Sequence, residues 1–384
     1  MSRELSLSSR SHLLPSYARQ DVTFVRGEGA WLVADDGRRY LDFVAGIAVV
    51  GLGHRHPAVS AAAQAQLDRL WHVSNLFWTR PMAELAGRLS ARFGGAEAFF
   101  CNSGAEAIEA AIKYARKATG RPGVVALEGS FHGRTLGALS ATGQPAKQAG
   151  FGPLVPGVSF ARPDDIESLE AAVSPGGDTA LILLEPVLGE GGVRPLEPGF
   201  LAAAAEIAAE VGALLAFDEI QTGVGRTGTF FAFEQTGVRP SLATLAKGLA
   251  NGLPIGCLLV ADEASGGFGP GDHASTFGGN PVACAAACAV VEAITDELLA
   301  SVRTAGERLA AGLAALPGVV DVRGRGLLLA AELDRPAGPV VAAALEEGLL
   351  LTSTGERVLR LTPPLVVATE EIDRGLEVLV EVLA

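Results

Sequence analysis

Six short apolar runs, spread over residues 98–261, constrain the fold most. They are AFFCN (98–102), VVAL (124–127), LILLEP (181–186), ALLAFDE (213–219), LATLAK (242–247) and CLLVA (257–261). Apolar side chains occupy successive positions in these runs, which predicts strands that are covered on both faces and is typical of a parallel sheet. Helical patterns such as 105–119 and 198–211 lie between the runs. This alternation predicts an α/β domain built from βαβ units.

Polar side chains follow several of these predicted strands, at the point where each strand ends. Asn102, Glu185, Asp218 and Lys247 all occupy such positions. Open α/β sheets bind their ligands at the carboxyl ends of the strands. We therefore expect these four side chains to converge on a binding site.

The pattern changes after residue 281, where long helices are followed by two hairpin-like segments, 319–333 and 348–365, and a last amphipathic helix from about 369. The segment 22–43 is also strand-like, with the turn DDG at 35–37. We predict a large α/β domain over 49–285 with a mostly parallel sheet. Residues 1–48 and 286–384 are expected to form a small α+β domain from both ends of the chain.

Lys247 is the only charged residue of the segment TLAKGLANGLPIG (244–256). Burying an unpaired ammonium costs several kcal/mol or more. The chain has only three other lysines, Lys113, Lys117 and Lys147, whose surroundings are ordinary in the sequence. A lysine can lose its proton and act as an amine nucleophile, whereas an arginine stays charged. We therefore expect Lys247 to do chemistry.

The segment CNSGAEAIEAAIKYARK (101–117) combines a strand end, a glycine turn and a helix start. Ser103 and Glu106 match the Ser-x-x-Glu capping box. The free N–H groups of Gly104 and Ala105 at the helix N-terminus are suited to bind an anion. A plain helix cap is the alternative interpretation.

Asp218 ends a buried strand, where an aspartate needs a cationic partner. The following glycines, Gly223, Gly225 and Gly228, match the spacing of the dinucleotide fingerprint. We reject that interpretation because the fingerprint should open a helix directly after a strand, and a nicotinamide-dependent dehydrogenase stays only a distant alternative. Here DEIQ intervenes and the aromatic segment TFFAFEQTG follows.

Three further loops contain candidate site residues. SFHGRT (130–135) could stack an aromatic ring on a planar ligand and hold a carboxylate, EPVLGEGG (185–192) carries two glutamates, and HASTFGGNP (273–281) carries two hydroxyls. The histidines of GHRHP (53–57), His54 and His56, could suggest a metal, but we expect them to lack nearby carboxylate or cysteine ligands and predict no metal site.

Composition excludes other classes. The net charge of −13 argues against nucleic acid as a partner. No apolar stretch reaches the roughly 18 residues of a membrane span, and residues 1–20 lack the apolar core of a signal peptide. The four cysteines form no CxxC pair and are expected to be buried thiols in a reducing compartment. We expect a cytoplasmic protein.

Taken together, these motifs resemble the class III aminotransferases of fold type I over almost the whole chain. FHGRT, LLEPVLGEGG, FDEIQTGVGRTG, LAKGLANGLPIG and STFGGNP carry the resemblance. Within the class, LDFVAGIAVVGLGHRHP and LWHVSNLFWT are similar to acetylornithine aminotransferases. Such enzymes use pyridoxal 5'-phosphate, which needs a lysine to bond to, an acid for its ring nitrogen and an anion site for its phosphate.

The resemblance implies cofactor-binding residues. Lys247 would bond to the cofactor and shuttle the proton, and Asp218 would pair with the ring nitrogen. Gln221 would lie near the ring hydroxyl, and Phe131 would stack on the ring face. The phosphate would be bound by Gly104 and Ala105 and by Thr276 from the partner subunit of a homodimer. Ala105 departs from the threonine of many relatives, which removes one hydroxyl contact to phosphate.

The resemblance also implies substrate-binding residues. Arg134 would hold the α-carboxylate of the amino donor, with Ser275 nearby. Arg360 would take the second carboxylate of the keto acid, and Glu190 would pair with Arg360 when a substrate lacks that carboxylate. Ile47 replaces a tyrosine of ornithine aminotransferases, which favours an acylated ornithine.

The implied reaction is transfer of the amino group of N2-acetyl-L-ornithine to 2-oxoglutarate, a step of arginine biosynthesis. Related donors remain as alternatives within the class: 4-aminobutyrate, succinylornithine or a carrier-linked donor of lysine biosynthesis. A non-catalytic dimer without cofactor is a further alternative.

Overall fold

The computed structural model describes residues 12–173 and 177–384. Within them, the central sheet has seven strands in the order β4-β12-β11-β10-β7-β5-β6. Their bounds are β4 (Ala96–Cys101), β5 (Gly123–Leu127), β6 (Val158–Ala161), β7 (Thr179–Leu184), β10 (Leu214–Asp218), β11 (Leu242–Leu245) and β12 (Gly256–Ala261). Six of the expected runs are strands of this sheet, so the prediction of an α/β fold is confirmed. The strand β6 was missed because VSFA is short and only half-buried.

The sheet is mostly parallel, as predicted. β10 pairs in parallel with β7 and β11, and β5 does so with β6 and β7. β12 alone runs the other way, antiparallel to both β11 and β4. The carboxyl ends of β4, β7, β10 and β11 therefore meet at one edge of the sheet, and the residues that follow them lie together there.

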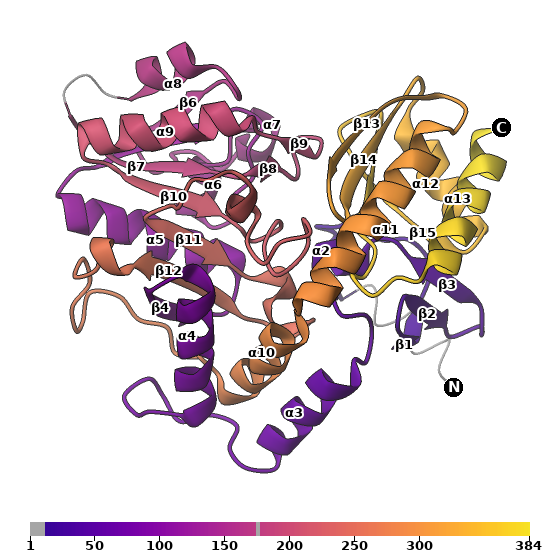
Figure 1. Cartoon of the computed structure of the whole chain (residues 1–384), viewed down its shortest axis with the longest axis horizontal. Helices are drawn as coiled ribbons and strands as arrows, with labels where there is room; N and C mark the ends of the chain where they lie inside the picture. Colours follow the sequence, from indigo (N-terminus) through magenta and orange to yellow (C-terminus); the bar gives the residue numbers. More distant parts are fainter. Residues whose placement is uncertain (1–11, 174–176) are drawn as a thin grey trace.

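Helices cover both faces of the sheet (Figure 1), which explains why its strands are apolar throughout. On one face, α5 packs on alternate strand residues such as Val124, Ala126 and Leu258. On the other, helices pack on the intervening residues, such as Val125 and Leu259. The first face is covered by α5 (Gly104–Thr119), and the helices of the other face are α4 (Arg80–Phe93), α8 (Ile166–Ala172), α9 (Pro198–Val211) and α10 (Pro281–Ala293).

The described ends of the chain form two further sheets of four strands beside the large one (Figure 1). The first joins β1 (Phe24–Glu28), β2 (Trp31–Ala34) and β3 (Arg39–Asp42) to β15 (Leu349–Leu350), which pairs in parallel with β3. The second contains β13 (Val319–Arg325), β14 (Leu328–Leu333), β17 (Val358–Leu361) and β16 (Thr352–Thr354). Both chain ends thus contribute to one region, although the domain boundaries at 48 and 285 stay predictions.

Shorter elements and the remaining helices complete the described chain. The helices are α2 (Ala45–Ala48), α3 (Pro57–Leu67), α6 (Leu136–Ser140), α7 (Pro145–Gln148), α11 (Asp296–Ala314), α12 (Ala337–Glu346) and α13 (Thr369–Leu383). The other elements are the strands β8 (Val187–Leu188) and β9 (Arg194–Pro195), and the 3-10 turns η1 (Ala232–Gln235), η2 (Lys247–Ala250) and η3 (Asp262–Ala264).

Two expectations from composition can be compared with the structure. All four cysteines are buried with free thiols, as predicted. Among the described helices, none combines the length and apolar character needed to cross a bilayer. Much of the N-terminal segment considered for a signal peptide, residues 1–11, lies outside the described residues.

Candidate active site

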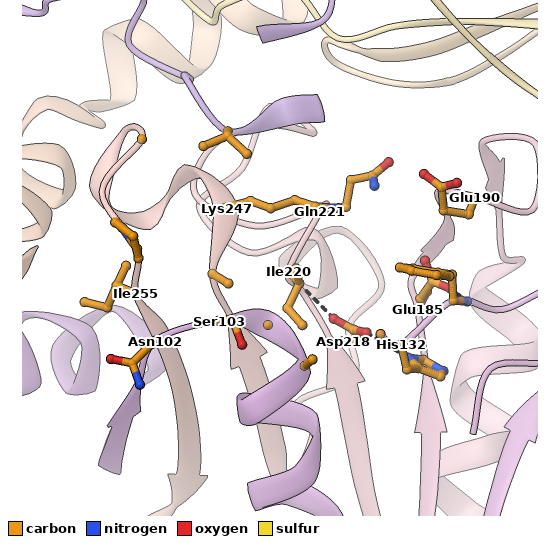
Figure 2. Close-up of a pocket in the computed structure, with 18 of the residues that line it drawn as sticks. Asn102, Ser103, His132, Glu185, Glu190, Asp218, Ile220, Gln221, Lys247 and Ile255 are labelled. Carbon is orange, nitrogen blue, oxygen red and sulfur yellow. Dashed lines mark hydrogen bonds and ion pairs between the residues drawn. The ribbon is translucent and has the colours of Figure 1, made fainter. Parts of the chain in front are cut away.

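A cavity of about 310 Å3 lies at the carboxyl edge of the central sheet. All four residues predicted at strand ends line it: Asn102, Glu185, Asp218 and Lys247, which lie at or just after the carboxyl ends of β4, β7, β10 and β11. Their predicted convergence is therefore confirmed. Figure 2 shows the Lys247 side chain extending toward Gln221, with Asp218 below both of them and beside His132.

Lys247 is held in an unusual environment for a lysine. Its φ of 36° lies in the left-handed region, which is strained for a residue other than glycine. Backbone strain of this kind occurs mainly at functional sites. No hydrogen bond or ion pair joins its ammonium to another described residue. Burial, assisted by the nearby Arg360 guanidinium, lowers the pKa of Lys247 to about 8. At this pKa, roughly a tenth of the Lys247 side chains are neutral amines at pH 7, the form that a nucleophile or a general base requires.

Asp218 is fixed by three donors. Its Oδ2 lies 2.7 Å from Nδ1 of the buried His132, and its Oδ1 accepts from the Ile220 N–H at 3.0 Å and the Thr244 hydroxyl at 3.2 Å. This network orients the carboxylate at the floor of the cavity (Figure 2). His132 Nε2 has no hydrogen-bond partner in the described part of the chain. The carboxylate–imidazole pair can thus hold a cationic group in the cavity.

Glu185 organises the loop that carries Phe131. Its Oε1 accepts from the Phe131 N–H at 2.8 Å and its Oε2 from the Gly189 N–H at 3.0 Å. Burial raises the pKa of Glu185 to about 7, and the neighbouring Asp218 adds to the rise. Glu185 therefore positions an aromatic ring on the cavity wall.

The N-terminus of α5 opens into the cavity at Ser103, Gly104 and Ala105. Ser103 caps the helix, accepting from the Glu106 N–H at 3.3 Å, whereas Glu106 reaches back to the Asn102 N–H at 2.7 Å instead of that of Ser103. A Cβ on Gly104 would come within 2.8 Å of Ile220, so glycine allows the close approach of the two segments. The free N–H groups of this helix end are suited to bind an anion.

Glu190 and Arg360 form an ion pair at the other side of the cavity. Glu190 sits in the turn between β8 and β9 and lines the cavity, whereas Arg360 lies on β17 with its side chain only 4% exposed. Burial by itself raises the pKa of Glu190, but the Arg360 guanidinium outweighs it, and the pKa lies below its ordinary value. The pair brings the C-terminal region of the chain to the cavity.

Five predicted residues lie outside the cavity lining: Arg360, which reaches it through Glu190, and four others. Arg134 is exposed, with its guanidinium 5.6 Å from the centroid of the Phe131 ring. Ser275 accepts from the Asn102 amide at 3.1 Å, and Thr276 beside it is exposed. Ile47 is 42% exposed on α2, where its φ of 67° is rare for a β-branched residue. Their roles stay predictions.

Two expectations about surroundings were wrong. Lys147 does not have ordinary surroundings, because its ammonium lies 3.8 Å from Glu190 Oε2 and 5.1 Å from the Phe131 ring centroid. His54 does have a carboxylate nearby, since its Nε2 lies 2.7 Å from Asp42 Oδ2. Among the described residues, however, no group of three His, Cys, Asp or Glu side chains could hold a metal ion.

The glycines 223, 225 and 228 lie in turns that follow β10, and no helix begins there in the described chain. The rejection of a dinucleotide fingerprint is therefore consistent with the structure. Gln221, from the same loop, lines the cavity with an Oε1 that has no hydrogen-bond partner among the described residues. An unpartnered buried acceptor of this kind is suited to a ligand hydroxyl or N–H.

A partly buried amine, a fixed carboxylate and a helix N-terminus at the carboxyl edge of a mostly parallel sheet are suited to chemistry on amines. Residues 15–383 match the family model described as aminotransferase class-III. The chain belongs to this family, and it is an aminotransferase.

Relatives extend the comparison over nearly the full length. The chain is 48% identical to the acetylornithine aminotransferase of Corynebacterium efficiens, over 97% of this chain and 95% of that protein. N-acetylornithine aminotransferase from Stenotrophomonas maltophilia matches with a TM-score of 0.84 and 37% identity, covering 98% of both chains. Ornithine aminotransferase from Toxoplasma gondii, which contains PLP at partial occupancy, matches with a TM-score of 0.93 and 32% identity, over 100% and 94% of the chains.

Proposed function

We propose that the enzyme uses pyridoxal 5'-phosphate to transfer the amino group of N2-acetyl-L-ornithine to 2-oxoglutarate. The products are N-acetylglutamate 5-semialdehyde and glutamate, which places the reaction in arginine biosynthesis. The observation that carries the proposal is the Glu190–Arg360 ion pair, whose glutamate lines the same cavity as the N-terminus of α5. The names of the relatives favour acetylornithine over the other donors of the class.

The donor set of the cavity fits the cofactor. Lys247 supplies the amine, Asp218 a carboxylate for the ring nitrogen and the N-terminus of α5 the N–H groups for phosphate. Phe131 lies on the wall for the ring face, and the unpartnered Gln221 Oε1 is free to accept from the ring hydroxyl. When bound, the cofactor supplies an aldehyde that reacts with amines and a ring that takes up the electron pair left by the departing proton.

The residues of the chain then perform defined tasks. Lys247, with its lowered pKa, accepts the proton from the substrate carbon that carries the amine. It donates this proton again later in the same half-reaction. Asp218 is fixed by His132 and Thr244. Its carboxylate would keep the ring nitrogen protonated and positively charged, so that the ring can take up negative charge during the reaction. Arg134 is proposed to hold the carboxylate of the donor, with Ser275 nearby. Closure of the exposed Arg134 onto the substrate would be needed for that contact.

Visible absorbance of the purified protein tests the use of the cofactor. We expect an absorption band from the cofactor bonded to Lys247, which borohydride abolishes. A dehydrogenase, or a protein that has lost its cofactor, would lack this band. A protein without it would contradict the proposal.

Arg360→Ala should damage the 2-oxoglutarate half-reaction far more than the donor half-reaction. 2-Oxoglutarate has two carboxylates and needs Arg360 for one of them, whereas N2-acetyl-L-ornithine ends in an uncharged acyl group. Loss of a buried charged partner costs 2–5 kcal/mol, so we expect a fall in kcat/KM of roughly 10²–10³-fold in the first half only. Single-turnover rates measure each half separately. Arg357→Ala, an exposed change three residues away, is the control, and an equal loss in both halves would contradict the assignment.

Ile47→Tyr should raise the use of free ornithine relative to N2-acetyl-L-ornithine. A phenol can hydrogen-bond the second ammonium of ornithine, which an isoleucine side chain cannot do. Hydrogen bonds to charged groups contribute about 1.5–3 kcal/mol, so the ratio of kcat/KM values should change by about tenfold or more. Ile166→Tyr is the matched control, because Ile166 has the same 42% exposure on α8. An unchanged ratio in Ile47→Tyr would remove Ile47 from the specificity site.

The protein is proposed to be a cytoplasmic homodimer in which Thr276 reaches the phosphate of the partner's site. Trp71, Leu76 and Trp78 are 67%, 85% and 89% exposed, and Phe277 beside Thr276 is 60% exposed. Large exposed apolar surfaces mark sites of association. The segment around Leu76 is joined to that of Phe277 through Asn75, which donates to the Gly278 carbonyl at 2.8 Å. Light scattering of the purified protein tests the dimer.

A further inference from the structure

Glu190 faces two cations rather than one. Its Oε1 pairs with Arg360, and its Oε2 lies 3.8 Å from the ammonium of Lys147. The Thr354 hydroxyl donates to the Glu190 carbonyl, which anchors the backbone of the turn. The side chain can therefore move between its two partners while its backbone stays in place.

Lys147 reaches Glu190 from α7, beside the cavity. Its ammonium lies 5.1 Å from the centroid of the Phe131 ring, in range of a cation–π contact, and its side chain is 26% exposed. Lys147 is thus partly desolvated and close to the cavity without lining it. It can therefore hold the Glu190 carboxylate without occupying the cavity.

The reaction requires Glu190 to have a second partner. A ligand carboxylate that takes Arg360 displaces Glu190, and an unpaired carboxylate that is mostly buried is costly. The charges acting on Glu190 are those of Arg360, Lys247 and Lys147. Arg360 is then occupied by the ligand and Lys247 is engaged in the chemistry, which leaves Lys147.

We propose that Lys147 is a specificity-determining residue that receives the Glu190 carboxylate whenever a dicarboxylate ligand occupies Arg360. This inference rests on the proposed function, whose keto acid is such a ligand. Lys147 lowers the cost of freeing Arg360 for dicarboxylates and does nothing for ligands with one carboxylate. It acts through Glu190 and is a positioning residue.

Calorimetry on the cofactor-loaded enzyme can measure this effect without turnover. Glutarate serves as an unreactive dicarboxylate and valerate as its monocarboxylate counterpart. A partly exposed ion pair contributes up to about 1 kcal/mol, so Lys147→Met should raise the Kd of glutarate by roughly fivefold. The Kd of valerate should not change. Lys147→Arg should restore glutarate binding, and Lys117→Met, which removes an exposed lysine paired with Asp272, is the control.

A double-mutant cycle separates action through Glu190 from direct contact with the ligand. In a Glu190→Gln background, the effect of Lys147→Met on glutarate should vanish. A loss of the same size in that background, an equal loss for valerate, or no loss in Lys147→Met itself would overturn the inference. Because these measurements use binding, they are separate from the proposed function, which fails if the unmodified enzyme makes no glutamate from any donor.

Discussion

Lys247→Ala is expected to abolish transamination while leaving the fold intact. The side chain is the amine of the cavity, and its lowered pKa suits it to carry the proton. General acid–base catalysis alone contributes about 10²–10⁴-fold, so the loss of a group that also bonds to the cofactor should exceed about 10⁴-fold. The fold should survive, because no ion pair or hydrogen bond of the ammonium to the described residues is lost.

Borohydride labelling followed by peptide mapping identifies the lysine that bonds to the cofactor. The label should appear on Lys247 and be absent from the Lys247→Ala variant. Lys113→Ala is the matched control, since Lys113 lies on the exposed side of α5 and contacts His273 at 2.8 Å. A label on Lys113 or Lys147 would contradict the assignment.

Asp218→Asn should still bind the cofactor but lose activity by several orders of magnitude. An amide keeps the size of the side chain and can still accept from the Ile220 N–H and the Thr244 hydroxyl. It cannot balance a positive charge on the ring nitrogen, so the ring takes up negative charge poorly. We expect a loss of roughly 10³-fold or more in kcat, of the kind that electrostatic groups of active sites produce.

Glu219→Gln is the control for Asp218→Asn. Glu219 is the adjacent buried carboxylate, but it contacts Thr222 and the Phe233 N–H instead of the cavity. Its pKa is raised to about 7 by burial, so a neutral amide resembles the protonated form that it can adopt. Glu219→Gln should keep most of its activity. Near-normal turnover of Asp218→Asn would mean that the Asp218 carboxylate is only structural.

The sheet and its catalytic edge could be predicted because they follow from local patterns. Buried strands are apolar at successive positions, so Asp218 and Lys247 stand out as charges at the ends of such runs. The helix cap at Ser103 follows from spacing within one turn. The strand β6 could not be predicted in this way, because its four residues, VSFA, are too few to show a run of buried apolar positions.

Contacts between distant segments could not be predicted from these patterns. His132 and Asp218 are separated by 86 residues, and nothing in either segment specifies the partner. Lys147 was interpreted as ordinary because its proximity to Glu190 depends on how α7 packs against the turn between β8 and β9. The Glu190–Arg360 pair was expected only from resemblance to a family.

The rates of glutamate formation from 2-oxoglutarate with a panel of amino donors test the central claim most directly. The panel comprises N2-acetyl-L-ornithine, N2-succinyl-L-ornithine, free ornithine and 4-aminobutyrate, each at several concentrations. We predict the highest kcat/KM for N2-acetyl-L-ornithine, with free ornithine clearly poorer. A higher kcat/KM for 4-aminobutyrate or free ornithine, or no glutamate from any donor, would contradict the account.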